Sequence, residues 1–353
     1  MQLFRPVMAV EFMVGTVLAQ VAMDSPARPQ DALLSDMDLP YRRHFYPLGY
    51  SVEIVTNEQA VLTVAEECFG HVRSLRRSAG LQIRVGVTQR EEDVCPPEPV
   101  RRAFGHLFSL VADTDNQALL DLKTGMNFTW ITQAALNNRL YFRSNFLEKV
   151  VYLLVGASVV TDLHAACVSR NGMGILLCGE SGAGKSTLAY ACARAGWTYT
   201  SDDTSYLIND ALRPRVIGHC HRARFRPEAR SIFPELAGRA ITPRMEGKPS
   251  IEVPIADLPV EYTAAEADVH AIVFLNRRPA TGCDLLRQPR GSATERMRGE
   301  LYSTGEIRIR HEEALEALAD VPAYELQYCE LKDGIDALES LVLQVARDRR
   351  TGL

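Results

Sequence analysis

The sequence lacks several features that would place it in a specialised class. Its eight cysteines form no C-x-x-C pair, and over 353 residues they are too sparse for a disulfide scaffold. This pattern favours a reducing, cytoplasmic compartment. The formal net charge is -5, so there is no overall basic excess and we expect no nucleic-acid partner. No internal repeat, coiled-coil pattern or low-complexity tract is present.

The N-terminal region is rather apolar, so a signal or membrane segment has to be considered there. Glu11 interrupts it, and the stretch from Phe12 to Met23 is too short to span a bilayer. A single Arg5 without a clear small-residue cleavage site disfavours a secretory signal. Residues 25–40 have the polar, proline-containing composition of a linker. We therefore expect residues 1–40 to be a poorly constrained extension, and we expect no membrane association.

The remaining chain predicts an α/β protein of two domains, because 353 residues exceed the size at which a single core usually stops growing. We expect an α+β module over residues 41–155 and a second domain over 156–353. Hydrophobic periodicity predicts the elements of the first module. They are strands near 50–57, 81–89, 106–113, 116–125 and 126–133, and helices near 58–72 and 145–160.

A glycine-rich stretch, GILLCGESGAGKST over residues 174–187, carries the strongest functional signal. An apolar strand precedes it, a helix follows, and its spacing satisfies G-x-x-x-x-G-K-[ST], in which backbone N–H groups surround phosphate oxygens. The start of the helix favours an anion as well. The predicted nucleotide-binding residues are Gly179, Glu180, Ser181, Gly182, Ala183, Gly184, Lys185, Ser186 and Thr187. We expect Lys185 to be solvated until it meets the outer phosphates and Ser186 to hold Mg²⁺.

Two adjacent carboxylates follow the next predicted strand, 197–201. Neighbouring strand residues face opposite ways, so one carboxylate can face the phosphates while the other holds a metal. Transfer of a γ-phosphoryl group needs a base for the attacking hydroxyl, and Asp202 is the best-placed candidate. Asp203 is then the candidate metal ligand. A solvated turn is the alternative interpretation of the pair.

Several weaker patterns follow in the second domain. Arg222, Arg224 and Arg226 alternate as on one face of a strand, where they suit a phosphate or an acidic substrate, or form a solvated edge. The cluster at residues 219–221 lacks zinc spacing. Further strands are expected near 251–258, 269–277 and 324–331, and helices near 310–322 and 333–349, the last capped by Asp333. This order predicts a mixed sheet.

Residues 163–207 resemble the catalytic core of the HPr kinase/phosphorylase family. The resemblance rests on His164, fifteen residues before the first loop glycine, on GESGAGKST, and on SDD after the next helix. It implies a phosphoenolpyruvate carboxykinase-like P-loop kinase that uses ATP and Mg²⁺, with Asp202, His164 and Lys185 catalytic and Ser186 and Asp203 at the metal. Thr187 stands where the bifunctional enzymes carry glutamate. The chain therefore looks closer to the related kinases that modify a serine of a protein or peptide.

Three classes of function remain open from the sequence. The first is a kinase acting on a serine of a protein or peptide, the second is a kinase of a small metabolite, and the third is a nucleotide-dependent switch or scaffold with slow hydrolysis. An arginine-lined groove would favour the first class. Self-association into a homo-oligomer is also left open.

Overall fold

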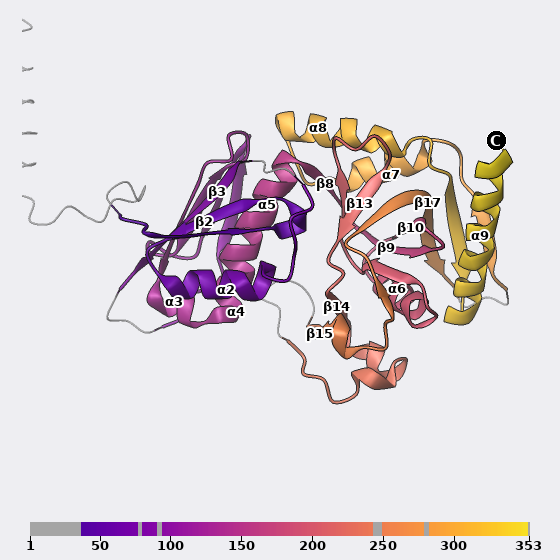
Figure 1. Cartoon of the computed structure of the whole chain (residues 1–353), viewed down its shortest axis with the longest axis horizontal. Coiled ribbons are helices and arrows are strands. Elements are labelled where there is room, and N and C mark those ends of the chain that lie inside the picture. The colour runs from indigo at the N-terminus through magenta and orange to yellow at the C-terminus, as the bar shows by residue number, and fades with distance from the viewer. Residues whose placement is uncertain (1–36, 77–79, 90–93, 243–248, 279–281, 352–353) are drawn as a thin grey trace, which may run out of the picture.

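The chain folds around two β-sheets that lie side by side along the long axis of the molecule (Figure 1). The structure is a computed structural model and describes residues 37–76, 80–89, 94–242, 249–278 and 282–351. The extension expected over residues 1–40 lies almost wholly outside these ranges. Among the described residues, no helix has both the length and the apolar character that a membrane span needs.

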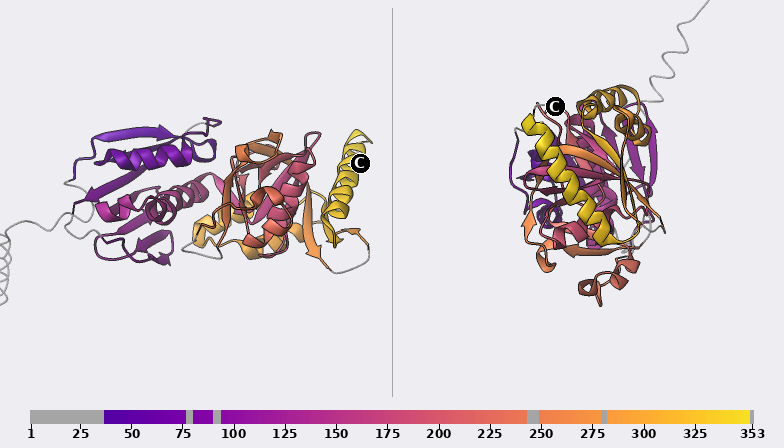
Figure 2. Two further views of the ribbon diagram at one scale, coloured as in Figure 1. Left: turned by 90° about the horizontal axis from the view of Figure 1, so that it is seen from below. Right: turned by 90° about the vertical axis from the view of Figure 1, so that its right-hand side faces the viewer.

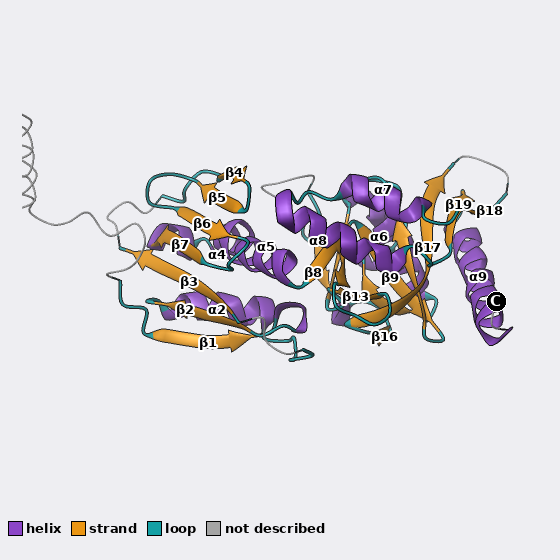
Figure 3. Cartoon of the chain, turned by 90° about the horizontal axis from the view of Figure 1, so that it is seen from above, coloured by secondary structure: helices purple, strands orange, loops and turns teal. Residues whose placement is uncertain are grey.

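The first sheet has seven strands in the order β1-β2-β3-β7-β6-β5-β4. The pairs β2–β3 and β3–β7 are parallel and the others antiparallel. Its helices lie on one face, behind the strands in Figure 3. The strands are β1 Tyr41–Phe45, β2 Val52–Thr56, β3 Leu81–Thr88, β4 Val100–Phe104, β5 Leu107–Val111, β6 Gln117–Asp121 and β7 Asn127–Thr132. The helices are α2 Gln59–Phe69, α3 Gln133–Asn137, α4 Arg139–Phe142, the π-helical turn η2 Arg143–Leu147 and α5 Glu148–Ser158.

The second sheet has ten strands and is mixed. Its main path runs β16-β11-β9-β10-β17-β13-β12-β8, and β19 pairs with both β17 and β18. The strands are β8 Val160–Leu163, β9 Ala165–Arg170, β10 Met173–Cys178, β11 Thr198–Ser201, β12 Ser205–Ile208, β13 Arg215–Gly218, β16 Tyr262–Thr263, β17 Glu266–Arg277, β18 Asp284–Arg287 and β19 Ala323–Tyr328. In a separate two-stranded sheet, β14 Arg222–Phe225 pairs antiparallel with β15 Ile251–Pro254.

Helices cover both faces of the second sheet. They are α6 Lys185–Arg194, α7 Ser292–Glu300, α8 Gly305–Leu315 and α9 Leu331–Thr351. Alternate residues of β10 enter different cores: Ile175 and Leu177 pack with α6 and α9, whereas Leu176 and Cys178 pack with α7 and α8. Burial on both faces explains why this strand is a continuous apolar run. In Figure 1 and in the left view of Figure 2, α9 lies at the end of the molecule farthest from the first sheet.

The hydrophobic core of the first module extends into the second sheet. The cluster built from the first sheet, α2 and α5 also includes Tyr206, Ile208 and Ile217 of the second sheet. Helix α5 ends at Ser158 and β8 begins at Val160, so a single residue separates them. The first module is therefore packed directly against the β8–β12–β13 side of the second sheet.

The α/β class and the mixed sheet are confirmed, but three local predictions are wrong. The helix expected over 145–160 is too long, because Val160 already pairs with Ile208 in the sheet. The helix expected at 310–322 begins earlier, at Gly305, and α7 precedes it without having been predicted. Asp333 is not the cap of the last helix, since α9 begins at Leu331 and contains Asp333 in its first turn.

Candidate active site

The glycine-rich loop connects β10 to α6 and depends on glycine at three positions. Gly179, Gly182 and Gly184 have φ values of 149°, 95° and 98°, which L side chains rarely adopt. A Cβ atom on Gly179 would lie 2.9 Å from the Cβ of Ala183. Gly184 immediately precedes α6, and no side chain caps the helix there. The loop therefore presents the N–H groups of the first turn of α6, as an anion site requires.

Lys185 begins α6 and is buried, so the expectation of a solvated lysine is wrong. Its Nζ donates to the carbonyl oxygen of Gly179 at 2.7 Å and to that of Glu180 at 3.3 Å. Burial lowers the pKa of Lys185, and the negative charge of Asp203 opposes that shift. Lys185 thus links the end of the loop to its beginning, and its charge interacts with the carboxylate of Asp203. Of the other loop residues, Glu180, Ser181 and Gly182 are exposed, and Ala183, Ser186 and Thr187 are half-buried.

The aspartate pair follows β11 at the same edge of the sheet as the loop. Strand β9 runs antiparallel to both β10 and β11, so β10 and β11 point the same way and end together. Asp202 is 6% exposed, and its Oδ2 accepts a hydrogen bond of 2.6 Å from the backbone N–H of Arg224. Burial raises the pKa of Asp202 to about 6, although the Arg224 N–H and guanidinium act against this. A carboxylate in this state is a better proton acceptor than an ordinary aspartate.

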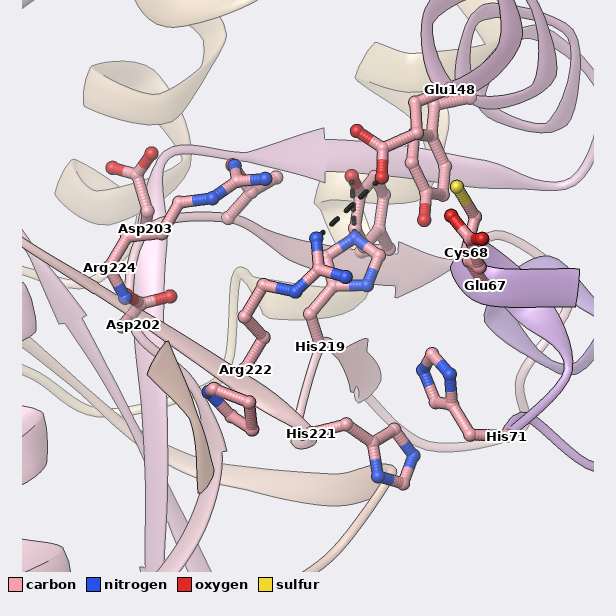
Figure 4. Close-up of a pocket in the computed structure, with 14 residues that line it drawn as sticks. Glu67, Cys68, His71, Glu148, Asp202, Asp203, His219, His221, Arg222 and Arg224 are labelled. Atoms are coloured by element: carbon pink, nitrogen blue, oxygen red, sulfur yellow. Dashed lines mark hydrogen bonds and ion pairs between the residues drawn. The ribbon is translucent and has the colours of Figure 1, made fainter. Parts of the chain in front are cut away.

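Asp203 has a different environment from its neighbour, and the two side chains diverge in Figure 4. Its side chain is half exposed, and its Oδ1 lies 3.5 Å from Nε2 of His164. His164 does not lie on a strand, as the sequence suggests, but in the bend between β8 and β9. Asp203, His164 and Lys185 are therefore neighbours, which the sequence spacing alone does not establish.

The three arginines of residues 222–226 fall into two groups with different partners. Arg222 and Arg224 lie on one face of β14, as predicted, and both form ion pairs with Glu252, at 2.6 Å and 3.5 Å. Arg226 lies just after the strand, and its Nη2 donates to Oγ of Ser181 in the loop at 3.2 Å. Thus Arg226 belongs to the loop, and the other two belong to a cavity beside it.

That cavity has a volume of about 410 Å³ and reaches from the aspartate pair to the first module (Figure 4). Helix α2 and the residues after it contribute Glu67, Cys68 and His71, and α5 contributes Glu148 and Tyr152. The strands and connecting segments from β11 to β15 contribute the rest. The residues of the first module could not be predicted from the sequence. They precede the aspartates by fifty positions or more, and no local pattern connects them.

Two further residues near the loop were also missed. Glu300, at the end of α7, lines a small cleft with His164, and its charge favours the ammonium form of Lys185. Tyr328, at the end of β19, has its Oη 3.1 Å from the position of a Cβ on Gly184. This hydroxyl and Nη1 of Arg226 are both buried without a hydrogen-bond partner among the described residues. Two unpaired donors beside the loop are consistent with an anionic ligand.

Metal-ligating side chains are few. Among the residues that the structure describes, no three His, Cys, Asp or Glu side chains come together to hold a metal ion. Within the cluster at residues 219–221, His219 packs edge to face against the rings of Tyr152 and Tyr206. The hydroxyl of Ser186 and the carboxylate of Asp203 fit Mg²⁺, which uses one or two protein ligands together with phosphates and water.

Comparisons with known proteins add little to this geometry. No family model matches the sequence, and no curated protein sequence matches it. Among solved structures, the chain is similar to the Hpr(Ser) kinase/phosphatase from Coxiella burnetii, with a TM-score of 0.31 and 11% sequence identity. The match covers 54% of this chain and 97% of that chain. A likeness at this level does not assign an activity to this chain.

Proposed function

We propose that the protein is an ATP-dependent phosphotransferase that transfers the γ-phosphoryl group to a serine hydroxyl of a protein or peptide. The observation that carries the proposal is the meeting of two features at one sheet edge. One is the glycine loop with its buried Lys185, and the other is Asp202, whose pKa is about 6. Phosphoryl transfer needs positioning, neutralisation of phosphate charge and a proton acceptor, and this edge offers all three.

In the proposed reaction, the N–H groups of the loop, Lys185 and the donors of Arg226 and Tyr328 bind the phosphates. A Mg²⁺ ion on Ser186 and Asp203 would neutralise charge on the phosphate oxygens. The acceptor hydroxyl gives its proton to Asp202 and forms a bond to the γ-phosphorus, while the bond to the β-phosphate oxygen breaks and ADP leaves. His164 beside Asp203 orients that carboxylate.

A kinase of a small metabolite is the second candidate, and the cavity favours it. A volume of about 410 Å³ falls within the range of small-molecule sites, roughly 300–1,000 Å³. A nucleotide-dependent switch or scaffold is the third. Binding of nucleotide alone does not require a proton acceptor beside the loop, which is the role that the proposal gives to Asp202.

The test is to incubate the purified chain with Mg²⁺, γ-labelled ATP and a cell extract, and to identify the labelled products by mass spectrometry. Labelled serine in a protein or peptide supports the proposal, and label confined to small molecules supports the second candidate. Asp202→Asn and Asp203→Asn are the matched variants. We expect the first to keep nucleotide affinity and lose transfer, and the second to show weaker, Mg²⁺-dependent nucleotide binding. Tight ATP binding without transfer to any fraction would favour the switch.

A further inference from the structure

A second cavity lies where the first module meets helix α8. It has a volume of about 200 Å³, and we call it the α5–α8 cavity. Its lining comes from β4, β5, α5, β8, α8 and the residues that connect α7 to α8. Figures 1 and 3 show α8 next to α5 at this boundary. Among the described residues, Tyr152 alone lines both this cavity and the one beside Asp202, so the two are separate sites.

Most of the lining of the α5–α8 cavity is apolar. Leu107 of β5, Leu153 of α5 and Ile307 of α8 contribute aliphatic side chains. Tyr302, in the connection between α7 and α8, is 97% exposed although it adjoins this apolar surface. An exposed aromatic residue beside an apolar cavity is typical of a binding site. Because an apolar cavity of about 150 Å³ is known to hold benzene, this one has room for one aromatic ring with a short chain.

Asp162 is the one Asp, Glu, Lys or Arg side chain among the described residues that line this cavity. It lies on β8, the edge strand of the second sheet, and its Oδ1 is 3.2 Å from the position of a Cβ on Gly156 of α5. No described residue forms a hydrogen bond or an ion pair with its side chain. The carboxylate is accessible from the cavity, but the protein around it raises its pKa to about 6. Asp162 therefore lacks a cationic partner.

The other titratable groups around Asp162 do not supply that cation. Tyr206 pairs with Asp162 across β12 and β8, and Tyr152 lines the cavity from α5. Burial raises the pKa of both hydroxyls well above the usual value, so both are neutral. The ring nitrogens of His311 on α8 lie 2.9 Å from a serine hydroxyl and 3.0 Å from the carbonyl oxygen of Gly156. Burial lowers the pKa of His311, so this imidazole is neutral as well.

We propose that the α5–α8 cavity binds a small organic amine, with its ammonium group on Asp162 and its apolar body against Leu153, Ile307 and Tyr302. The ammonium group supplies the cation that the carboxylate lacks and donates a charge-assisted hydrogen bond to it. The apolar body displaces water from aliphatic and aromatic side chains, which favours binding. The face of Tyr302 also attracts a cation. Neither nucleotide nor phosphoryl transfer is involved, so this proposal does not depend on the proposed function.

The first experiment compares three probes that share a phenyl ring and differ in charge: 2-phenylethylamine, 2-phenylethanol and phenylacetate. Calorimetric titration of the full chain at pH 7.5 gives a Kd for each. The charge-assisted hydrogen bond predicts that the amine binds about 10- to 100-fold more tightly than the alcohol, and phenylacetate should bind more weakly than either. Equal Kd values for the amine and the alcohol would overturn the proposal. So would a failure of the amine to bind at up to about 10 mM, a weak limit for a ligand of this size.

Variants locate the binding, because the cavity beside Asp202 also contains carboxylates. Asp162→Asn should raise the Kd of the amine to that of the alcohol and leave the Kd of the alcohol unchanged. Asp202→Asn is the matched control and should leave the affinity for the amine unchanged. Ala103→Trp, at an exposed position of β4 that lines the α5–α8 cavity, should weaken binding of the amine and the alcohol alike. Amine binding that is equally tight in Asp162→Asn and in the parent would refute the role of Asp162.

The affinity for the amine should also depend on pH. With a pKa of about 6, Asp162 is about nine-tenths protonated at pH 5 and ionised at pH 7.5, so the Kd of the amine should rise about tenfold as the pH falls between them. The alcohol should show no such change, and neither should the amine with Asp162→Asn. A dependence that persists in this variant would assign the titration to His311 or another group and overturn the proposal. Melting curves at both pH values show whether each variant folds. If Asp162→Asn does not fold, the comparison of probes on the parent and on Ala103→Trp decides.

Discussion

Replacing Asp202 by asparagine should make the protein more stable and inactive at the same time. The carboxylate is 6% exposed, and burial raises its pKa from 3.8 to about 6. A shift of about 2 units at 1.36 kcal/mol per unit means that ionised Asp202 costs about 3 kcal/mol at pH 7. Asparagine carries no charge and can still accept the N–H of Arg224. Its amide N–H₂ needs a partner, so we expect a net gain of about 1–3 kcal/mol.

The raised pKa of Asp202 also predicts how the stability difference between parent and variant changes with pH. Because the pKa of Asp202 is higher in the folded chain, the unfolded chain binds fewer protons between about pH 3.8 and 6. The parent is therefore destabilised as the pH rises through this window, and the cost is complete above it. Asp202→Asn lacks this titration. Its advantage should be largest at pH 7 and should shrink to a small fraction near pH 4.

Urea denaturation of the parent and the variant at pH 7 and near pH 4 measures the difference. Asp203→Asn is the control, because the Asp203 side chain is 49% exposed and its replacement removes no buried charge. In the same samples, phosphoryl transfer by Asp202→Asn should fall by about 10²–10⁴. If Asp202→Asn is less stable than the parent at pH 7, or its advantage does not change with pH, the argument from a buried, ionised carboxylate is refuted.

Four other predictions concern the loop and the base. Below about pH 6, log kcat/KM for transfer should fall by one for each pH unit, because Asp202 becomes protonated. A pH profile of kcat/KM without this decrease would exclude Asp202 as the base. Lys185→Ala should lose ATP binding in calorimetry and also lower the melting temperature, because two carbonyl oxygens lose their donor. Gly184→Ala should lower the free energy of unfolding by about 1–2 kcal/mol, because its φ is 98°, and should also weaken ATP binding. Gly238→Ala, with φ 74° in open space, should lower the stability but leave ATP binding unchanged. Tyr328→Phe should weaken ATP binding while leaving the melting temperature equal to or above that of the parent; unchanged affinity would remove the hydroxyl from the proposed site.

The loop and its flanking elements could be predicted from sequence because the pattern that identifies them is local. The apolar run of β10, the glycines and the start of α6 occupy fourteen consecutive residues. The buried state of Lys185 could not be predicted in the same way, since its surroundings include Asp203 and Glu300, which come from other parts of the chain. Helix α7 was missed for a related reason: only Ala293, Thr294 and Met297 of its residues are buried, so it has little hydrophobic periodicity.

The sequence predicted only those residues of the candidate site that lie close together along the chain. Asp202 and Asp203 follow a recognisable strand, but the partner of Asp202 is a backbone N–H of Arg224, twenty-two residues later. The cavity wall needs α2, α5 and β14 to meet, and that meeting is decided by the packing of two sheets. A single sequence contains no signal for such long-range contacts, so the end of the cavity next to the first module became visible only in the fold.

The one-residue connection between α5 and β8 limits how this protein can evolve. The two sheets have no flexible linker at which one part could be exchanged for another. A chain starting at residue 156 would keep the loop and both aspartates, but it would expose Tyr206, Ile208 and Ile217 to water. The two halves must therefore be inherited, or engineered, as a unit. New acceptor preferences are then expected to arise by single substitutions in the cavity wall, and not by shuffling of modules.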